Sequence, residues 1–173
     1  MSVHLVLGGA RSGKSAYAQQ YAADTALGVT VIATGEARDA EMAARIARHR
    51  ADRPAHWRTR EEPLHLATVL REEAGEDRCV LVDCLTLWLL NALSGGEAVY
   101  REERRQWLAL LPQLPGRIVL VANEVGLGVV PMGELSRRFV DEAGWLNQDV
   151  ARLAQRVTFV AAGLPLCLKR DQT

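Results

Sequence analysis

The sequence has few cysteines, and they form no recognisable pattern. Cys79, Cys84 and Cys167 are the only three among 173 residues, and none belongs to a Cys-x-x-Cys pair. A disulfide framework or a zinc site needs paired or closely spaced cysteines, so we expect reduced thiols and a cytoplasmic location. The apolar run that starts directly after Met1 leaves no room for a signal peptide, and we expect none.

The chain also has no excess of positive or negative charge. Lys plus Arg and Asp plus Glu both number 21, which gives a formal net charge of zero. The chain has four Trp, three Tyr and two Phe, too few for an obvious base-stacking surface. Without a basic field or such a surface, we do not expect a nucleic-acid partner.

Long apolar runs, repeats and linkers are absent as well. The longest apolar stretch, around residues 80–90, is interrupted by Asp83 and is too short to cross a bilayer, so we expect no membrane span. We find no internal repeat, low-complexity tract or linker. Residues 1–173 are therefore expected to form a single domain, because a chain of this length can bury its own core.

The most informative stretch is Gly8-Gly9-Ala10-Arg11-Ser12-Gly13-Lys14-Ser15. It matches the phosphate-binding loop pattern G-x-x-x-x-G-K-[ST], and it lies between an apolar strand-like run and a helix-like run. In such a loop, backbone N–H groups and the helix N-terminus face the phosphates. Lys14 is then expected to reach the β- and γ-phosphates, and Ser15 to ligate Mg²⁺.

Alternation of strand-like and helix-like segments predicts an α/β fold with a mostly parallel sheet flanked by helices. The last two strands are split by Gly163 and are expected to pair antiparallel, with Pro165 placing the final strand at an edge. The expected strands are 3–7, 29–33, 79–82, 117–122, 157–161 and 164–168. The expected helices are 14–23, 39–50, a segment that opens at Glu61-Glu62-Pro63, 84–91, 97–111 and 134–156.

Polar residues follow several of these strands. Thr34-Gly35-Glu36, Asp83 and Asn123-Glu124 each come directly after one, and parallel strands bring such residues to one edge of the sheet, where ligands bind. Asp83 after an apolar strand is typical of the acidic residue that holds the Mg²⁺ shell in P-loop enzymes. A carboxylate could also orient a substrate hydroxyl, and Asp83 and Glu124 are both candidates for that role.

His49 ends the helix expected at 39–50, on the same face as Met42 and Ile46. A histidine is largely uncharged at neutral pH and can act as a nucleophile that splits a transfer into two easier steps. The neighbouring Arg48, Arg50 and Arg53 could neutralise phosphates. His56 is the next histidine candidate.

Together these stretches resemble a known family, the bifunctional adenosylcobinamide kinase / adenosylcobinamide-phosphate guanylyltransferases of cobalamin biosynthesis. The resemblance covers nearly the whole chain. It rests on Gly8–Ser15, Glu41–Arg50, Arg53–Thr59, Val82–Thr86, Asn123–Pro131, Arg138-Phe139 to Asn147-Gln148, and Gly163-Leu164-Pro165.

The resemblance implies a RecA-like P-loop NTPase fold, a homotrimer and two reactions. A nucleoside triphosphate, ATP or GTP, would phosphorylate adenosylcobinamide, and GTP would then guanylylate a histidine that passes GMP to the corrinoid phosphate. By this resemblance His49, Lys14 and Asp83 would be catalytic, and Ser15 and Asp83 would bind Mg²⁺. The nucleotide contacts would be residues 8–15, Thr34, Gly35, Glu36, Arg50, Arg53, Glu61 or Glu62, and Asp83.

Two other interpretations remain open from the sequence. One is a monofunctional P-loop kinase for a small molecule, without covalent histidine chemistry. The other is a non-catalytic or motor-like nucleotide-binding module of the RecA type. Guanylylation of His49 would separate the first from the bifunctional enzyme, and hydrolysis stimulated by DNA would favour the second.

Overall fold

The computed structural model describes residues 2–37, 39–51 and 53–170. Its centre is one seven-stranded sheet with the order β3-β2-β4-β5-β1-β6-β7. All neighbouring strands pair parallel except β6 and β7, which pair antiparallel. This confirms the mostly parallel α/β sheet and the antiparallel terminal pair with Pro165 in the edge strand. The strands are β1 (Ser2–Gly8), β2 (Gly28–Ala33), β3 (Arg58–Glu61), β4 (Arg78–Asp83), β5 (Arg117–Asn123), β6 (Arg156–Ala161) and β7 (Leu164–Lys169).

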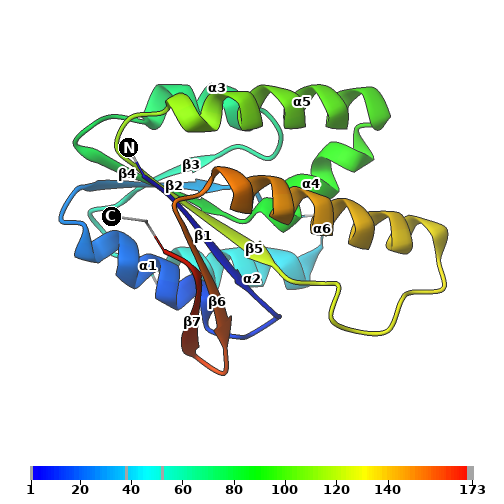
Figure 1. The fold of residues 1–173 in the computed structure, drawn as a ribbon. Helices are drawn as coiled ribbons and strands as arrows, with labels where there is room; N and C mark the ends of the chain where they lie inside the picture. The colour runs from blue at the N-terminus through cyan, green and yellow to red at the C-terminus, as the bar shows by residue number, and fades with distance from the viewer. Residues whose placement is uncertain (1, 38, 52, 171–173) are drawn as a thin grey trace.

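Helices cover both faces of this sheet (Figure 1). One face carries α1 and α2, and the other carries α3, α4, α5 and α6. Their bounds are α1 (Lys14–Asp24), α2 (Ala40–Ala51), α3 (Leu66–Glu73), α4 (Leu85–Ser94), α5 (Glu97–Leu110) and α6 (Glu134–Leu153), with a short 3₁₀ turn at Leu111–Gln113. Among the described helices, none is long and apolar enough to cross a membrane.

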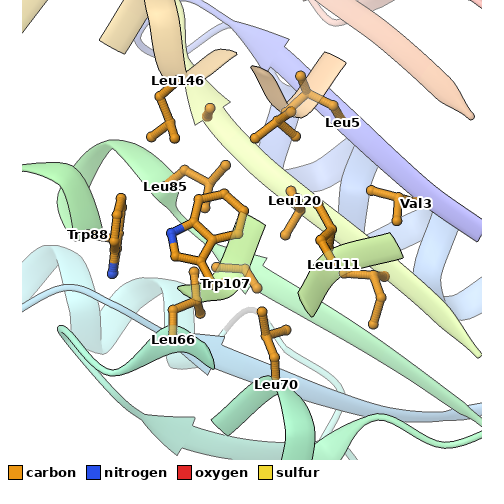
Figure 2. Packing of buried hydrophobic residues seen from close by; sticks show 14 of the residues in the cluster. Val3, Leu5, Leu66, Leu70, Leu85, Trp88, Trp107, Leu111, Leu120 and Leu146 are labelled. Carbon is orange, nitrogen blue, oxygen red and sulfur yellow. The ribbon is translucent and has the colours of Figure 1, made fainter. Parts of the chain in front are cut away.

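The larger core lies under the four-helix face (Figure 2). Trp88 of α4 and Trp107 of α5 are fully buried and meet edge to face, with ring centroids 5.4 Å apart. The indole N–H of Trp88 donates to the carbonyl of Leu64 at 2.8 Å, so burial leaves this donor satisfied. Leu66 and Leu70 of α3 pack into the same cluster. Helix α4 is therefore mainly a core helix, with Leu85, Trp88 and Leu89 fully buried.

Strand β3 was not predicted from the sequence, because Arg58-Thr59-Arg60-Glu61 has no apolar alternation. It forms at the sheet edge, where its side chains pair with α3 instead of packing in the core. Arg60 donates to Glu73 at 3.0 Å, and Arg58 lies 3.7 Å from the same carboxylate, whose side chain is only 3 % exposed. The sequence of such a charged edge strand does not predict a strand by itself, because the contacts that stabilise it come from other elements.

Two helix boundaries also differ from expectation. Helix α3 begins at Leu66 and not at Pro63, because Glu61 belongs to β3 and the Glu62 carboxylate holds the N–H groups of Leu64 and His65 in a turn before the helix. Helix α6 ends at Leu153, where 156 was expected, because Arg156 already pairs with His4 in the sheet.

Candidate active site

The loop between β1 and α1 has the close backbone packing that its glycines suggested. A Cβ on Gly8 would lie 2.4 Å from Ser12 Oγ and 2.6 Å from the Val160 carbonyl oxygen, which is closer than atoms can approach. Gly13 has φ of +92°, a left-handed conformation that side chains rarely adopt. Lys14 follows directly, is 7 % exposed, and donates from Nζ to the Gly9 carbonyl at 3.1 Å.

Two threonine hydroxyls tie together the carboxyl ends of β2, β4 and β5. The Thr34 hydroxyl donates to the Cys84 carbonyl at 2.7 Å and accepts from the Cys84 N–H at 2.9 Å. The Thr86 hydroxyl accepts from the Asn123 N–H at 2.7 Å. Thr34 is fully buried, and its side chain holds the sheet edge together.

A pocket opens at this edge, between the P-loop and α2. We call it the central pocket. Eight of the predicted site residues line it, and they come from α1, β3, β4, α2 and the segments that follow β2 and α2. Its lining residues are Lys14, Ser15, Ala33, Gly35, Met42, Ile46, His49, Arg50, Arg53, Thr59, Glu61, Asp83, Cys84, Leu87 and Asn123.

Asp83 is the centre of the charged groups in the central pocket. Its Oδ2 lies 3.5 Å from His49 Nδ1 and 3.7 Å from Arg53 Nη2. The Arg53 side chain is only 8 % exposed, and burial lowers the pKa of this guanidinium while Asp83 opposes that shift. The structure thus brings the predicted nucleophile, the predicted acidic residue and a buried cation into one cluster.

The adjacent glutamates have different environments. Glu61 lines the central pocket and lies 3.4 Å from Arg50. Glu62 accepts from the N–H groups of Leu64 and His65 at 2.9 and 2.8 Å, so its carboxylate is engaged by the turn that precedes α3. Of the two, Glu61 is the one placed to meet a ligand in this pocket.

Some predicted contacts lie beside the central pocket instead of lining it. Residues 8–13 form the loop next to Lys14 and Ser15, and their backbone, not their side chains, was expected to bind. Glu36 is exposed and is not part of the lining. Glu124 is also outside the lining, and its Oε1 accepts from the Gly126 N–H at 2.7 Å.

The sequence did not reveal the pocket's apolar wall as part of the site. Met42 and Ile46 of α2 face Leu87 of α4, and Ile46 and Leu87 both approach Gly35 closely enough that a Cβ there would touch them. The shared helix face of Met42, Ile46 and His49 was the available signal. Cys84 also lines the pocket, but burial raises the pKa of its thiol, which keeps it protonated and a poor nucleophile.

Asn123, which the sequence placed at the ligand-binding edge of the sheet, also lines the pocket. It ends β5 beside Gly8, and its Oδ1 is buried without a hydrogen-bond partner among the described residues. A buried amide oxygen in this position is suited to accept from a bound ligand or its water shell.

A P-loop lysine and serine, a strand-end aspartate and a histidine in one pocket can hold a triphosphate and present a nucleophile to it. The mostly parallel α/β sheet and the residues gathered at its edge are consistent with the P-loop NTPase class.

Residues 4–168 match the family model described as cobinamide kinase / cobinamide phosphate guanyltransferase, and the chain belongs to this family. It is accordingly a bifunctional enzyme of adenosylcobalamin biosynthesis, with the kinase and the guanylyltransferase activity.

Curated relatives agree over nearly the full length. The chain is 61 % identical over 168 residues to the bifunctional adenosylcobalamin biosynthesis protein CobP of Pseudomonas aeruginosa, covering 96 % of this chain and 97 % of that protein. It is 40 % identical to CobU of Salmonella typhimurium, over 95 % of this chain and 98 % of that protein. A solved structure from Pyrococcus horikoshii OT3 has the same fold at a TM-score of 0.56 and 10 % identity, covering 98 % of this chain and 86 % of that one.

Proposed function

We propose that guanylyl transfer proceeds through a covalent GMP adduct on His49. The observation that carries this proposal is that His49, Lys14, Ser15 and Asp83 line one pocket. A nucleophile and a triphosphate cradle in a single cavity support an attack on the α-phosphorus of GTP with pyrophosphate held by the P-loop.

Guanylyl transfer then takes place in two half-reactions. A lone pair of the His49 imidazole forms a bond to the α-phosphorus, and the bond from that phosphorus to the bridging oxygen of pyrophosphate breaks. A phosphate oxygen of adenosylcobinamide phosphate then attacks the same phosphorus, the P–N bond breaks, and His49 is regenerated. The product is adenosylcobinamide-GDP.

We propose that the kinase reaction uses the same P-loop, with a nucleoside triphosphate, ATP or GTP, as donor. Lys14 would hold the β- and γ-phosphates. Asp83, which lines the pocket, is favoured over Glu124 as the carboxylate that orients the aminopropanol hydroxyl, because the Glu124 carboxylate is bonded to Gly126 outside the lining.

Ser15 and Asp83 fit a Mg²⁺ site. A hydroxyl and a carboxylate are oxygen ligands, and Mg²⁺ usually takes only one or two protein ligands with substrate phosphates and water completing its shell. Both residues line the central pocket. When bound, Mg²⁺ would neutralise phosphate charge. We assign the remaining nucleotide contacts to the P-loop backbone, Gly35, Arg50, Arg53 and Glu61.

The test is the intact mass of the protein after incubation with GTP and Mg²⁺, and again after addition of the corrinoid phosphate. Wild type should gain a GMP-sized mass and lose it on addition of the corrinoid, and His49→Ala should gain none. His56→Ala, which changes a neighbouring exposed histidine, should still form the adduct. An adduct that persists in His49→Ala, or no adduct on wild type that binds GTP, would contradict the proposal.

We also propose that the whole chain acts as one domain in a cytoplasmic homotrimer. A single sheet that includes strands from both ends of the chain supports one domain. The three cysteines are free thiols, which fits a reducing compartment.

Two separate apolar surfaces support the trimer, because a closed ring of identical subunits needs two different contact patches on each. One is the loop after β5, which projects from the body of the molecule and leaves Leu127, Val129 and Met132 at least 80 % exposed (Figure 1). The other is β7, where Leu164, Leu166 and Leu168 are more than half exposed. Sedimentation should give a trimer for wild type and smaller species for Val129→Asp or Leu166→Asp.

A further inference from the structure

The contact between His49 and Asp83 distinguishes the two nitrogens of the histidine ring. His49 Nδ1 faces Asp83 Oδ2 at 3.5 Å, from the last turn of α2 to the end of β4. The His49 side chain is 35 % exposed and the Asp83 side chain is 12 % exposed, so the contact is partly shielded from water. Contacts of this kind are often long before substrate binds and shorten in the reacting complex.

The contact also selects one tautomer of the neutral ring. An ionised carboxylate only accepts hydrogen bonds, and a neutral imidazole carries a single N–H. When Nδ1 faces Asp83, the proton belongs on Nδ1 and the free lone pair belongs on Nε2. Arg53 Nη2, 3.7 Å from the same Oδ2, supplies a positive charge beside the carboxylate and fixes its position.

We propose that Asp83 is a positioning residue for guanylyl transfer, holding His49 by its Nδ1–H so that Nε2 forms the bond to GMP. The inference rests on the covalent transfer proposed above and deepens it. The Nε2 lone pair attacks the α-phosphorus, the bond to pyrophosphate breaks, and the Nδ1 proton stays beside Asp83, where the carboxylate stabilises the positive charge that develops on the ring. When the corrinoid phosphate displaces the P–N bond, the electron pair returns to Nε2.

The structure assigns Asp83 this role in addition to a contact with Mg²⁺, and the two roles are compatible. Both of the ionic contacts to Asp83 found among the described residues use Oδ2. A carboxylate has two oxygens and about four acceptor positions, so Oδ1 is left to the metal shell.

The first experiment determines which nitrogen carries GMP. Guanylylated wild type, labelled with ¹⁵N-histidine, is analysed by phosphorus–nitrogen and proton–nitrogen correlation NMR after digestion. We expect phosphorus on Nε2 of His49. Phosphorus on Nδ1 would overturn this inference while leaving the covalent mechanism standing. An adduct on another residue, or none at all, would overturn the proposed function and this inference with it.

The second experiment needs no turnover. The ¹⁵N shifts of the His49 ring in the free protein should show the Nδ1–H tautomer in wild type, and Asp83→Ala should shift the ring toward the Nε2–H form. Glu61→Gln, which alters the other carboxylate of the pocket, should leave the tautomer unchanged. An unchanged tautomer in folded Asp83→Ala would overturn the positioning role, and if that variant does not fold, the wild-type tautomer and linkage still decide.

Discussion

The two halves of the active site differ in how the fold holds them. The phosphate-binding half is built into the core, since Lys14, Ala18 and Ala22 of α1 are buried and Gly8 lies against the backbone of β6. The nucleophile half is on α2, where none of the side chains that the structure describes is buried. The fold therefore holds the proposed phosphate-binding loop by steric packing, whereas polar contacts at each end of α2 position His49.

This difference predicts which step each half controls. Changes in the phosphate-binding half should impair both reactions, and many should also reduce stability. Changes at α2 should slow guanylyl transfer selectively, because the proposed mechanism uses His49 only in that reaction.

The largest effect should come from Lys14→Met. Loss of a preorganised cation at the phosphates should lower kcat/KM of the kinase reaction on the order of 10²–10³-fold, and guanylylation should fall as well. Methionine fills similar space, so thermal unfolding without nucleotide should change little. Steady-state kinetics and a melting curve test this, and a loss below ten-fold would remove Lys14 from the proposed machinery.

The next largest effect should be the loss of stability caused by Gly8→Ala. Gly9→Ala, one residue away, is its matched control. The new Cβ would collide with the Val160 carbonyl, and such overpacking costs about 1–3 kcal/mol of unfolding free energy. Gly9 has no atom within 4 Å of a built Cβ, so Gly9→Ala should keep nearly wild-type stability. Urea unfolding of both variants measures the difference, and equal stabilities would show that the loop is not fixed by packing.

His4, in the strand that leads into the phosphate-binding loop, should make the free energy of unfolding depend on pH. It lies in β1 with Nε2 2.9 Å from Thr158 Oγ1, and burial, helped by Arg156, lowers its pKa from 6.5 to about 4. As the pH falls below 6.5 the unfolded chain takes up a proton at His4 that the folded protein excludes. Stability from this group is therefore complete above pH 6.5 and is lost as the pH falls toward 4.

Between pH 7.5 and pH 5 this loss should be about 2 kcal/mol. Denaturant unfolding of His4→Gln, which cannot titrate, should show a pH-dependent loss smaller by that amount. If wild type and His4→Gln lose stability in parallel, burial of His4 does not cause the acid sensitivity.

The phosphate-binding half could be predicted closely from the sequence, and the reason is physical. Gly8, Gly13 and Lys14 have roles set by local backbone geometry, which a short motif records. The strand-end position of Asp83 followed from the apolar run before it. The sequence also placed His49 at the end of a helix. Arg53 lies beyond the end of α2, and the meeting of both side chains at Asp83 depends on three-dimensional packing.

The other parts were missed because they depend on contacts distant in sequence. Strand β3 has no pattern of its own and forms because Arg58 and Arg60 pair with Glu73 of α3. Strand β3 also brings Glu61 to the pocket, whereas Glu62 follows the strand and bonds to the N–H groups of Leu64 and His65. Two adjacent glutamates cannot show this distinction in a sequence. The apolar wall needs Leu87, near the start of α4, to meet Ile46 of α2 beside Gly35 at the edge of the sheet, which only the fold establishes.

The smallest change in rate is expected from Asp39→Ala. This variant should affect α2 alone, so it tests whether the two halves of the site are independent. Asp39 Oδ1 accepts from the Met42 N–H at 2.7 Å and caps α2, and loss of such a cap costs about 1 kcal/mol. Since α2 contributes no described buried side chain, this cost should loosen the helix locally instead of unfolding the protein. Hydrogen exchange of α2 amides should accelerate, and guanylylation should slow by about five-fold, the equivalent of that free energy.

The kinase rate should stay within about two-fold of wild type, which is the size of effect that surface substitutions usually have. Asp39→Ser, which keeps a capping oxygen, should behave like wild type in both reactions. A kinase rate that falls in parallel with guanylylation would mean that α2 also organises the phosphate-binding half, and the two halves would then have to be treated as one cooperative unit.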